Sequence, residues 1–147
     1  MNIRILGCHG SDALLQGATG PHSCNTCGFL LNGTLLLDAG TVTTKLSLNE
    51  QKQIRHIILS HLHFDHIKGL PTLADNLSEQ MSAPIVVAGL PEVVHGLHRH
   101  IFNTDVYPDF FSIPTLERPT LTSSYLKPGN MYSFSGIDIT PILVNHT

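Results

Sequence analysis

Apolar residues fall in short runs whose length and composition are typical of β-strands. Ile3 to Leu6 predicts one strand, and Ile54 to Ser60 and Pro84 to Ala88, which carry β-branched residues, predict strands buried on both faces. Gly28 to Asp38 (GFLLNGTLLLD) predicts two more, joined at Asn32-Gly33, because that dipeptide suits a tight hairpin turn. The chain is therefore expected to begin with β structure.

Helical spacing follows each of the two buried strands. Leu70, Leu73 and Leu77 predict a helix over 70–80, and PEVVHGLHRHIF predicts a second helix over 91–102 with a proline in its first turn. A shorter helix with weak periodicity is expected within Val42 to Gln53. This β-α-β-α order predicts an α/β fold.

Glycine and proline mark the irregular segments. Gly10 to Gly20 holds three glycines and predicts a mobile loop, while 103–120 holds three prolines among aromatic residues and predicts a long irregular loop. Tyr125 to Thr147 predicts three short strands, of which the last, Ile137 to Val144, runs directly into His146.

Composition places the chain among single globular domains. It has 147 residues, 41% of them hydrophobic and 13% charged, with a net charge of −3. No stripe of Lys or Arg is present, which makes nucleic acid an unlikely partner, although a metal could supply positive charge for a small anionic substrate. No apolar run reaches the ~20 residues of a membrane span, and the N-terminus does not resemble a signal peptide. A cytoplasmic protein is expected.

Three cysteines, Cys8, Cys24 and Cys27, argue against a secreted disulfide framework because their number is odd. Reduced thiols are the main interpretation. The alternative is a structural zinc site built from the Cys24-x-x-Cys27 pair with Cys8 and either His9 or His22.

The stretch SHLHFDHIKGL, at 60–70, puts three imidazoles and a carboxylate into six positions directly after a predicted buried strand. An extended backbone would point His61, His63 and Asp65 to one side, so His66 must approach from another direction, where a helix begins. A solvated histidine-rich turn is the alternative. The end of a strand in an open α/β sheet is, however, where ligands usually bind.

Two close imidazoles suit one zinc ion, and an adjacent carboxylate and imidazole suit a second, so the stretch predicts a dinuclear centre. His146 also follows a predicted buried strand and would complete the first site beside His61 and His63, unless it is a solvated terminal residue. Asp38 either orients a ligand histidine or caps a turn. His56 is expected to pack within its strand, and His95 and His98 to lie at the surface.

These motifs together resemble a known superfamily. HLHFDH matches the H-x-H-x-D-H signature of the metallo-β-lactamase superfamily, with LLLDAG before it and GLP and a strand-borne histidine after it, in the expected order. The resemblance implies an αββα sandwich with a two-zinc site at one edge. It assigns His61, His63 and His146 to the first metal, and Asp65 and His66 to the second.

The longer pattern HLHFDHIKGLPTLADNL, followed by HIFNTDVYPDF and ILVNHT, is most similar to the class II 3′,5′-cyclic-nucleotide phosphodiesterases. This implies a small-molecule substrate, cyclic AMP or cyclic GMP, hydrolysed to the 5′-monophosphate by a metal-bridging hydroxide. Asp65 would be catalytic, holding the second metal and orienting that hydroxide. Zn²⁺ is the expected cofactor, with Mn²⁺ or Fe as alternatives.

Two questions stay open at this stage. The GLP also occurs in tRNA 3′-end processing endonucleases, which remain an alternative function. Tyr107, Asp109 and Phe110 of the proline-rich loop are predicted either to wall the nucleotide base or to pack onto the core.

In the family, a bridging aspartate and a final histidine for the second metal follow the position of His146. The resemblance thus predicts one domain over 1–147 that is incomplete at its C-terminal end, after the strand bearing His146. Its open core would favour association, for example as a homodimer. A truncated non-catalytic domain is the alternative, and the 147-residue chain is expected to hold at most one zinc tightly and to turn over little substrate.

Overall fold

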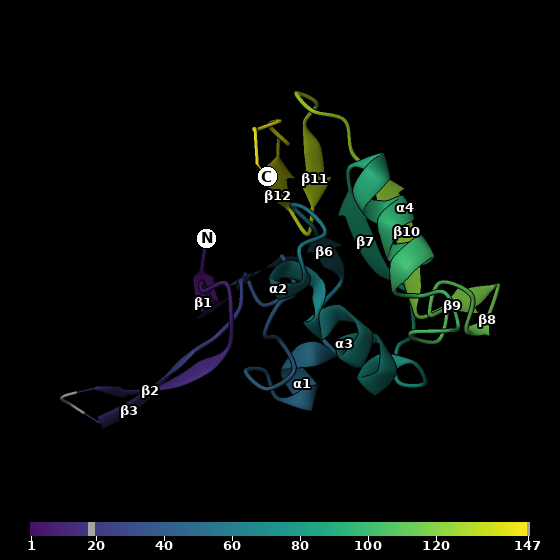
Figure 1. Ribbon diagram of the computed structural model, residues 1–147. Helices are drawn as coiled ribbons and strands as arrows, with labels where there is room; N and C mark the ends of the chain where they lie inside the picture. The colour runs from purple at the N-terminus through teal and green to yellow at the C-terminus, as the bar shows by residue number, and fades with distance from the viewer. Residues whose placement is uncertain (18–19, 147) are drawn as a thin grey trace.

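The computed structural model describes residues 1–17 and 20–146, and its centre is a six-stranded mixed sheet (Figure 1). In spatial order the strands are β1 (Ile3–Gly7), β4 (Gly28–Leu31), β5 (Leu35–Leu37), β6 (His56–Ile58), β7 (Ile85–Gly89) and β10 (Leu121–Tyr125). The first three pair antiparallel, and β5, β6, β7 and β10 pair parallel. The carboxyl ends of four strands therefore meet at one edge of the sheet.

The predicted hairpin between β4 and β5 is confirmed. Asn32 and Gly33 have φ angles of 48° and 75°, the positive values that a tight two-residue turn requires. The turn fixes the register in which Leu31 faces Leu35. It therefore decides which side chains of both strands enter the core.

The larger core lies on one face of the sheet, where α3 (Gly69–Leu77) and α4 (Pro91–His100) contribute their apolar side chains. The short helix α1 (Leu48–Gln51) packs beside α3. Leu70, Leu73 and Leu77 of α3 are fully buried, which stabilises the fold by about 1.5–3 kcal/mol for each side chain. Both longer helices thus lie where the apolar spacing predicts them.

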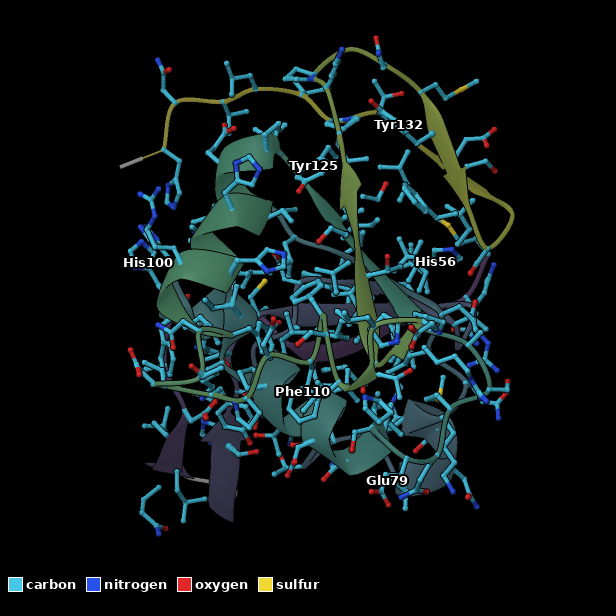
Figure 2. The ribbon with its side chains drawn as sticks, turned by 90° about the vertical axis from the view of Figure 1, so that its right-hand side faces the viewer. His56, Glu79, His100, Phe110, Tyr125 and Tyr132 are labelled. Atoms are coloured by element: carbon cyan, nitrogen blue, oxygen red, sulfur yellow. The ribbon has the colours of Figure 1, made fainter. Side chains whose placement is uncertain are left out.

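The opposite face of the sheet is covered in part by a hairpin of β11 (Tyr132–Phe134) and β12 (Ile137–Ile139). His56 of β6 meets this hairpin through its Nδ1 atom, 2.8 Å from the hydroxyl of Ser135, and its ring lies beside Phe134 (Figure 2). The expectation that His56 is a packing residue with a satisfied ring is confirmed. Ile3 and Ile5, on the same face at the β1 edge, remain 51% and 64% exposed.

The segment predicted as a mobile loop instead contains an antiparallel arm of β2 (Ala13–Gly17) and β3 (Gly20–Cys24), and that prediction is wrong. The two strands pair along their whole length, from Ala13 with Cys24 to Gly17 with Gly20, so the backbone groups are satisfied within the arm. Figure 1 shows the arm projecting away from the sheet. Residues 18 and 19, at the end of the predicted loop, lie outside the described residues.

Two other predicted elements are shorter in the structure. Within 42–53 only α1 is helical, because Ser47 caps it: Glu50 N–H donates to the Ser47 hydroxyl, and the Glu50 carboxylate accepts from Ser47 N–H at 2.8 Å. The last strand ends at Ile139 rather than Val144, since Pro141 has no N–H with which to extend the ladder. Over 140–146 the described chain belongs to no strand.

The proline-rich segment 103–120 is irregular, as predicted, apart from the two-residue strands β8 (Pro114–Thr115) and β9 (Arg118–Pro119). Its aromatic residues pack onto the core. Phe110 is 2% exposed and lies near Phe102 and Tyr107 (Figure 2). The segment therefore takes the packing role, one of its two predicted roles.

Candidate metal centre

The signature stretch leaves the sheet at the carboxyl end of β6 and turns into the short helix α2 (Phe64–Ile67). Its backbone is fixed on both sides. Ala39 N–H donates to the carbonyl of His66 at 2.7 Å, and Gly69 N–H donates to the carbonyl of Ala39 at 2.8 Å. Leu62 fills the space left by Gly96 of α4, where a Cβ atom would collide with its side chain. The histidines therefore sit on a rigid support.

Three imidazoles form what we call the imidazole cluster, consisting of His61, His63 and His146. One ring nitrogen of each lies within 4.8 Å of the others, and the Nε2 atoms of His61 and His146 are 3.1 Å apart. His63 and His146 are exposed and His61 is half-buried. The structure thus brings together the three residues predicted for the first metal, although His146 lies on no strand.

A second group, the carboxylate cluster, consists of Asp38, Ser60 and His66. Asp38 Oδ1 accepts from Ser60 N–H at 2.8 Å, and Asp38 Oδ2 lies 2.7 Å from His66 Nδ1. The Ser60 hydroxyl is 2.8 and 2.9 Å from the two carboxylate oxygens. Asp38 is 7% exposed and has a φ angle of 57°, so this turn places a buried acceptor directly behind His66.

Hydrogen bonding sets the tautomers of two histidines. An ionised Asp38 only accepts, so His66 Nδ1 carries the proton of their hydrogen bond and the Nε2 lone pair remains free. The Ser60 hydroxyl donates to Asp38, so it accepts from His61 Nδ1, 2.9 Å away, which frees Nε2 of His61 as well. Both imidazoles thus offer Nε2 for a metal, with the other nitrogen held as in many metal sites.

The charge state of the imidazole cluster also suits a cation. Partial burial, followed by the neighbouring imidazoles of His66, His63 and His146, lowers the pKa of His61 below its ordinary value of 6.5. A neutral imidazole is the form that binds a metal. Three imidazole nitrogens within 4.8 Å of one another suit zinc, which can take three protein ligands and leave a fourth position open.

Asp65 is not one of the residues of the imidazole cluster. The extended backbone ends at His63 and Asp65 lies in α2, so the alternation predicted for His61, His63 and Asp65 does not continue to Asp65. Asp65 Oδ2 lies 3.4 Å from Nε2 of His66, the free nitrogen of that ring. The two residues predicted for the second metal are therefore side by side.

A cavity of about 690 Å³ opens beside the histidines. Its lining combines polar residues of the centre with apolar residues of α4 and the C-terminal segment: Ser60, His61, Leu62, His63, His66, Leu90, Glu92, Val93, Ile142, Leu143, Val144 and His146. The aromatic residues of 103–120 are not part of this lining.

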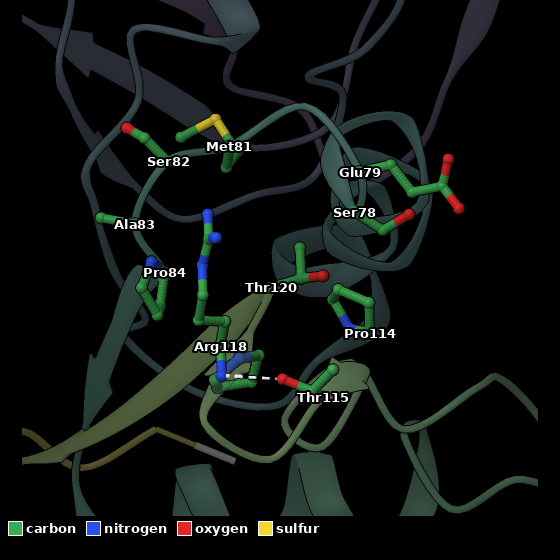
Figure 3. Close-up of a pocket in the computed structure, with 11 residues that line it drawn as sticks. Ser78, Glu79, Met81, Ser82, Ala83, Pro84, Pro114, Thr115, Arg118 and Thr120 are labelled. Carbon is green, nitrogen blue, oxygen red and sulfur yellow. Dashed lines mark hydrogen bonds between the residues drawn. The ribbon is translucent and has the colours of Figure 1, made fainter.

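Another cavity, of about 280 Å³, lies at the opposite edge of the sheet, where Pro84 and Thr120 precede β7 and β10 (Figure 3). Arg118 extends across it towards Met81. Its lining contains no histidine or cysteine. The chemistry that could bind a metal is therefore gathered at the other edge.

The sequence patterns did not predict Ser60, Glu92 or Cys27 as residues of this region. Cys27 Sγ lies 3.9 Å from Asp38 Oδ2, and burial, followed by the charge of Asp38, raises the pKa of its thiol to about 11. Ser60 directly precedes the signature, which was the available signal. The zinc site proposed for the three cysteines is not seen among the described residues, where each cysteine is free.

Comparison with solved structures defines the class of the fold. Unliganded yeast PDE1 superposes with a TM-score of 0.65 at 19% identity, covering 90% of this chain and 52% of that one. The metallo-beta-lactamase fold protein YhfI from Bacillus subtilis superposes with a TM-score of 0.59 at 17% identity, covering 94% of this chain and 51% of that one. The chain thus has the metallo-β-lactamase fold and spans about half the length of these two proteins.

The sequence narrows the class to a family. The family described as class-II cAMP phosphodiesterases matches residues 38–146, which is most of the chain and includes both clusters. This protein therefore belongs to the class-II cAMP phosphodiesterase family. No curated protein gives a significant match. Across the described residues, no helix is long and apolar enough to cross a membrane.

Proposed function

We propose that this chain forms the metal-binding part of a phosphodiesterase that hydrolyses a 3′,5′-cyclic nucleotide, cyclic AMP in the first instance, to the 5′-monophosphate. The observation that carries the proposal is the imidazole cluster at the mouth of the 690 Å³ cavity, in a chain of this family. Zinc is the expected metal, with manganese or iron as alternatives.

Each histidine has a defined part in holding the metals. His61, His63 and His146 would hold the first ion, with His61 fixed through its Nδ1 atom by Ser60. His66, oriented by Asp38, and Asp65 would contribute to the second. A bound pair of divalent ions supplies a water acidic enough to attack near neutral pH and positive charge for phosphate oxygens.

The other residues would position the substrate. Asp65 is the candidate for orienting the attacking water, because its carboxylate is half-buried and adjacent to His66. Leu62, Leu90 and Val93 give the cavity an apolar wall that suits a nucleobase. Exclusion of bulk water by such a wall strengthens the charge interactions inside.

The test is an assay of the protein from its complete reading frame with 3′,5′-cyclic AMP, separating the 5′- from the 3′-monophosphate by chromatography. We expect the 5′-monophosphate from the metal-loaded protein and loss of turnover in His63→Ala. His95→Ala, an exposed histidine of α4, is the matched control and should stay active.

Two results would contradict the proposal. One is intact cyclic AMP and cyclic GMP after incubation with folded, metal-loaded protein. The other is cleavage of a precursor tRNA under conditions where cyclic nucleotides survive, which would favour the endonuclease alternative.

A further inference from the structure

We propose that Cys27, Asp38 and His66 form a separate binding site for a thiophilic divalent cation such as zinc or cadmium. One ligand atom of each lies within 4.8 Å of the others. Asp38 Oδ2 stands 3.9 Å from Cys27 Sγ and 2.7 Å from His66 Nδ1. The proposed site uses Nδ1 of His66, whereas Nε2 of the same ring faces Asp65.

The separations are close to those of a tetrahedral zinc site. Bonds of about 2.3 Å to sulfur and about 2.0–2.1 Å to nitrogen or oxygen place neighbouring ligand atoms roughly 3.3–3.6 Å apart. The sulfur-to-oxygen distance must shorten by about 0.3 Å and the oxygen-to-nitrogen distance must lengthen by about 0.6 Å. Ser60 Oγ, 3.4 Å from His66 Nδ1, marks the direction of a fourth ligand or a water.

Charge and protons balance in this arrangement. The ion displaces the thiol proton of Cys27 to solvent, so thiolate and carboxylate together neutralise its two positive charges. His66 stays neutral, with its proton on Nε2 instead of Nδ1. There the proton points at Asp65 Oδ2, which is 3.4 Å away in the structure and able to accept it.

The donor set also predicts which ions bind. Thiolate is a soft ligand that favours zinc and similar metals over magnesium or manganese, whereas the imidazole cluster contains no sulfur. Occupation removes the lone pair of His66 from the second metal position. Under the proposed function, this site would therefore oppose loading of the second metal, although its existence does not depend on that function.

The competing interpretation is that Cys27 only packs beside Asp38. Cobalt(II) titration of the protein separates the two, because a cobalt–thiolate bond gives an intense charge-transfer band in the near ultraviolet and imidazole ligands do not. We expect the band in the wild type and in His61→Ala, which disrupts the imidazole cluster. Cys8→Ser should also retain it, since Cys8 is an exposed thiol.

The band should be lost in Cys27→Ser and in His66→Ala. Cobalt that binds without the band, or a band that survives Cys27→Ser, would overturn the proposal. A second measurement needs no change at Cys27: alkylation followed by mass spectrometry should show that cadmium protects this thiol in the wild type and in His61→Ala. Equal labelling of Cys27 with and without cadmium would also overturn it.

Discussion

The imidazole cluster and the carboxylate cluster stand side by side, with the rings of His61 and His66 4.1 Å apart, yet they are built in opposite ways. The carboxylate cluster is centred on the buried Asp38 and is closed by hydrogen bonds between residues of the fold. The imidazole cluster is open, and His146 reaches it from a segment outside any strand. Hydrogen bonds organise the first cluster, whereas the second brings together exposed rings from two segments that lie far apart in the sequence.

The largest effect should come from removing His146, the ligand that we propose for the C-terminal segment. His146→Ala should weaken zinc binding at the imidazole cluster by more than about 100-fold, beyond the loss typical for residues that only orient a ligand. Thermal unfolding of the metal-free protein should not change, because the side chain is exposed. Competition with a chromophoric chelator measures the affinity, with His100→Ala as the control. Unchanged affinity would remove His146 from the centre.

Asp38→Asn should lower both the metal affinity and the stability of the fold, and it therefore tests the difference between the two clusters. Asparagine tolerates the φ of 57°, so the change tests the lost charge and acceptor rather than backbone strain. We expect metal binding through His66 to weaken by roughly 10–100-fold. The free energy of unfolding should fall by about 1–3 kcal/mol, measured by urea denaturation without metal. An unchanged free energy of unfolding would mean that the carboxylate cluster is not preorganised.

Ser60→Ala removes the hydroxyl that links the clusters. His61 then loses the acceptor for Nδ1, so we expect its zinc affinity to fall by about 10-fold, the lower end for an orienting residue. Stability should fall by about 0.5–1.5 kcal/mol. Isothermal titration calorimetry compares this variant with Ser82→Ala, an exposed serine. Equal affinities of the two variants would show that the clusters act independently.

The smallest expected effect is a dependence of stability on pH. The pKa of His61 is below 6.5 in the folded protein and 6.5 when unfolded, so the unfolded chain binds the proton more readily. Without metal, the free energy of unfolding should therefore decrease as the pH falls below 6.5. Denaturation at about pH 7.5 and about pH 5.5 measures the decrease, which should be smaller in His61→Asn. An identical decrease in both proteins would exclude His61 as its source.

Local sequence patterns predicted most of the secondary structure that surrounds the candidate metal centre. In each case, a few neighbouring residues are enough to predict the element. The examples are the Asn32-Gly33 turn, the α3 leucines and the buried run before the signature. The pairing of β2 with β3 was not predicted, because the glycine-rich composition of this segment is also typical of loops. Only the hydrogen-bonded pairing of the two strands distinguishes the arm from a loop.

The site needed tertiary information that the spacing of residues does not hold. Hydrogen bonds to Asp38 join residues 22 and 28 positions away, and the contact of His146 with His61 spans 85 positions. The signature predicts metal ligands. It did not indicate which ring nitrogen each ligand would offer, because that depends on Ser60 and Asp38.

Gly96 of α4 faces the side chain of Leu62, and this contact bears on the effect of mutations at a position that carries no functional side chain. A single methyl group at this position would collide with the Cδ1 atom of Leu62, so the side chain of Leu62, which lies between His61 and His63 and lines the cavity, would have to shift. A Gly96→Ala protein would keep every metal-binding residue and still be expected to bind zinc less tightly. In genetic terms, the target for loss of function extends to a codon of α4 that encodes no ligand and lies outside the signature.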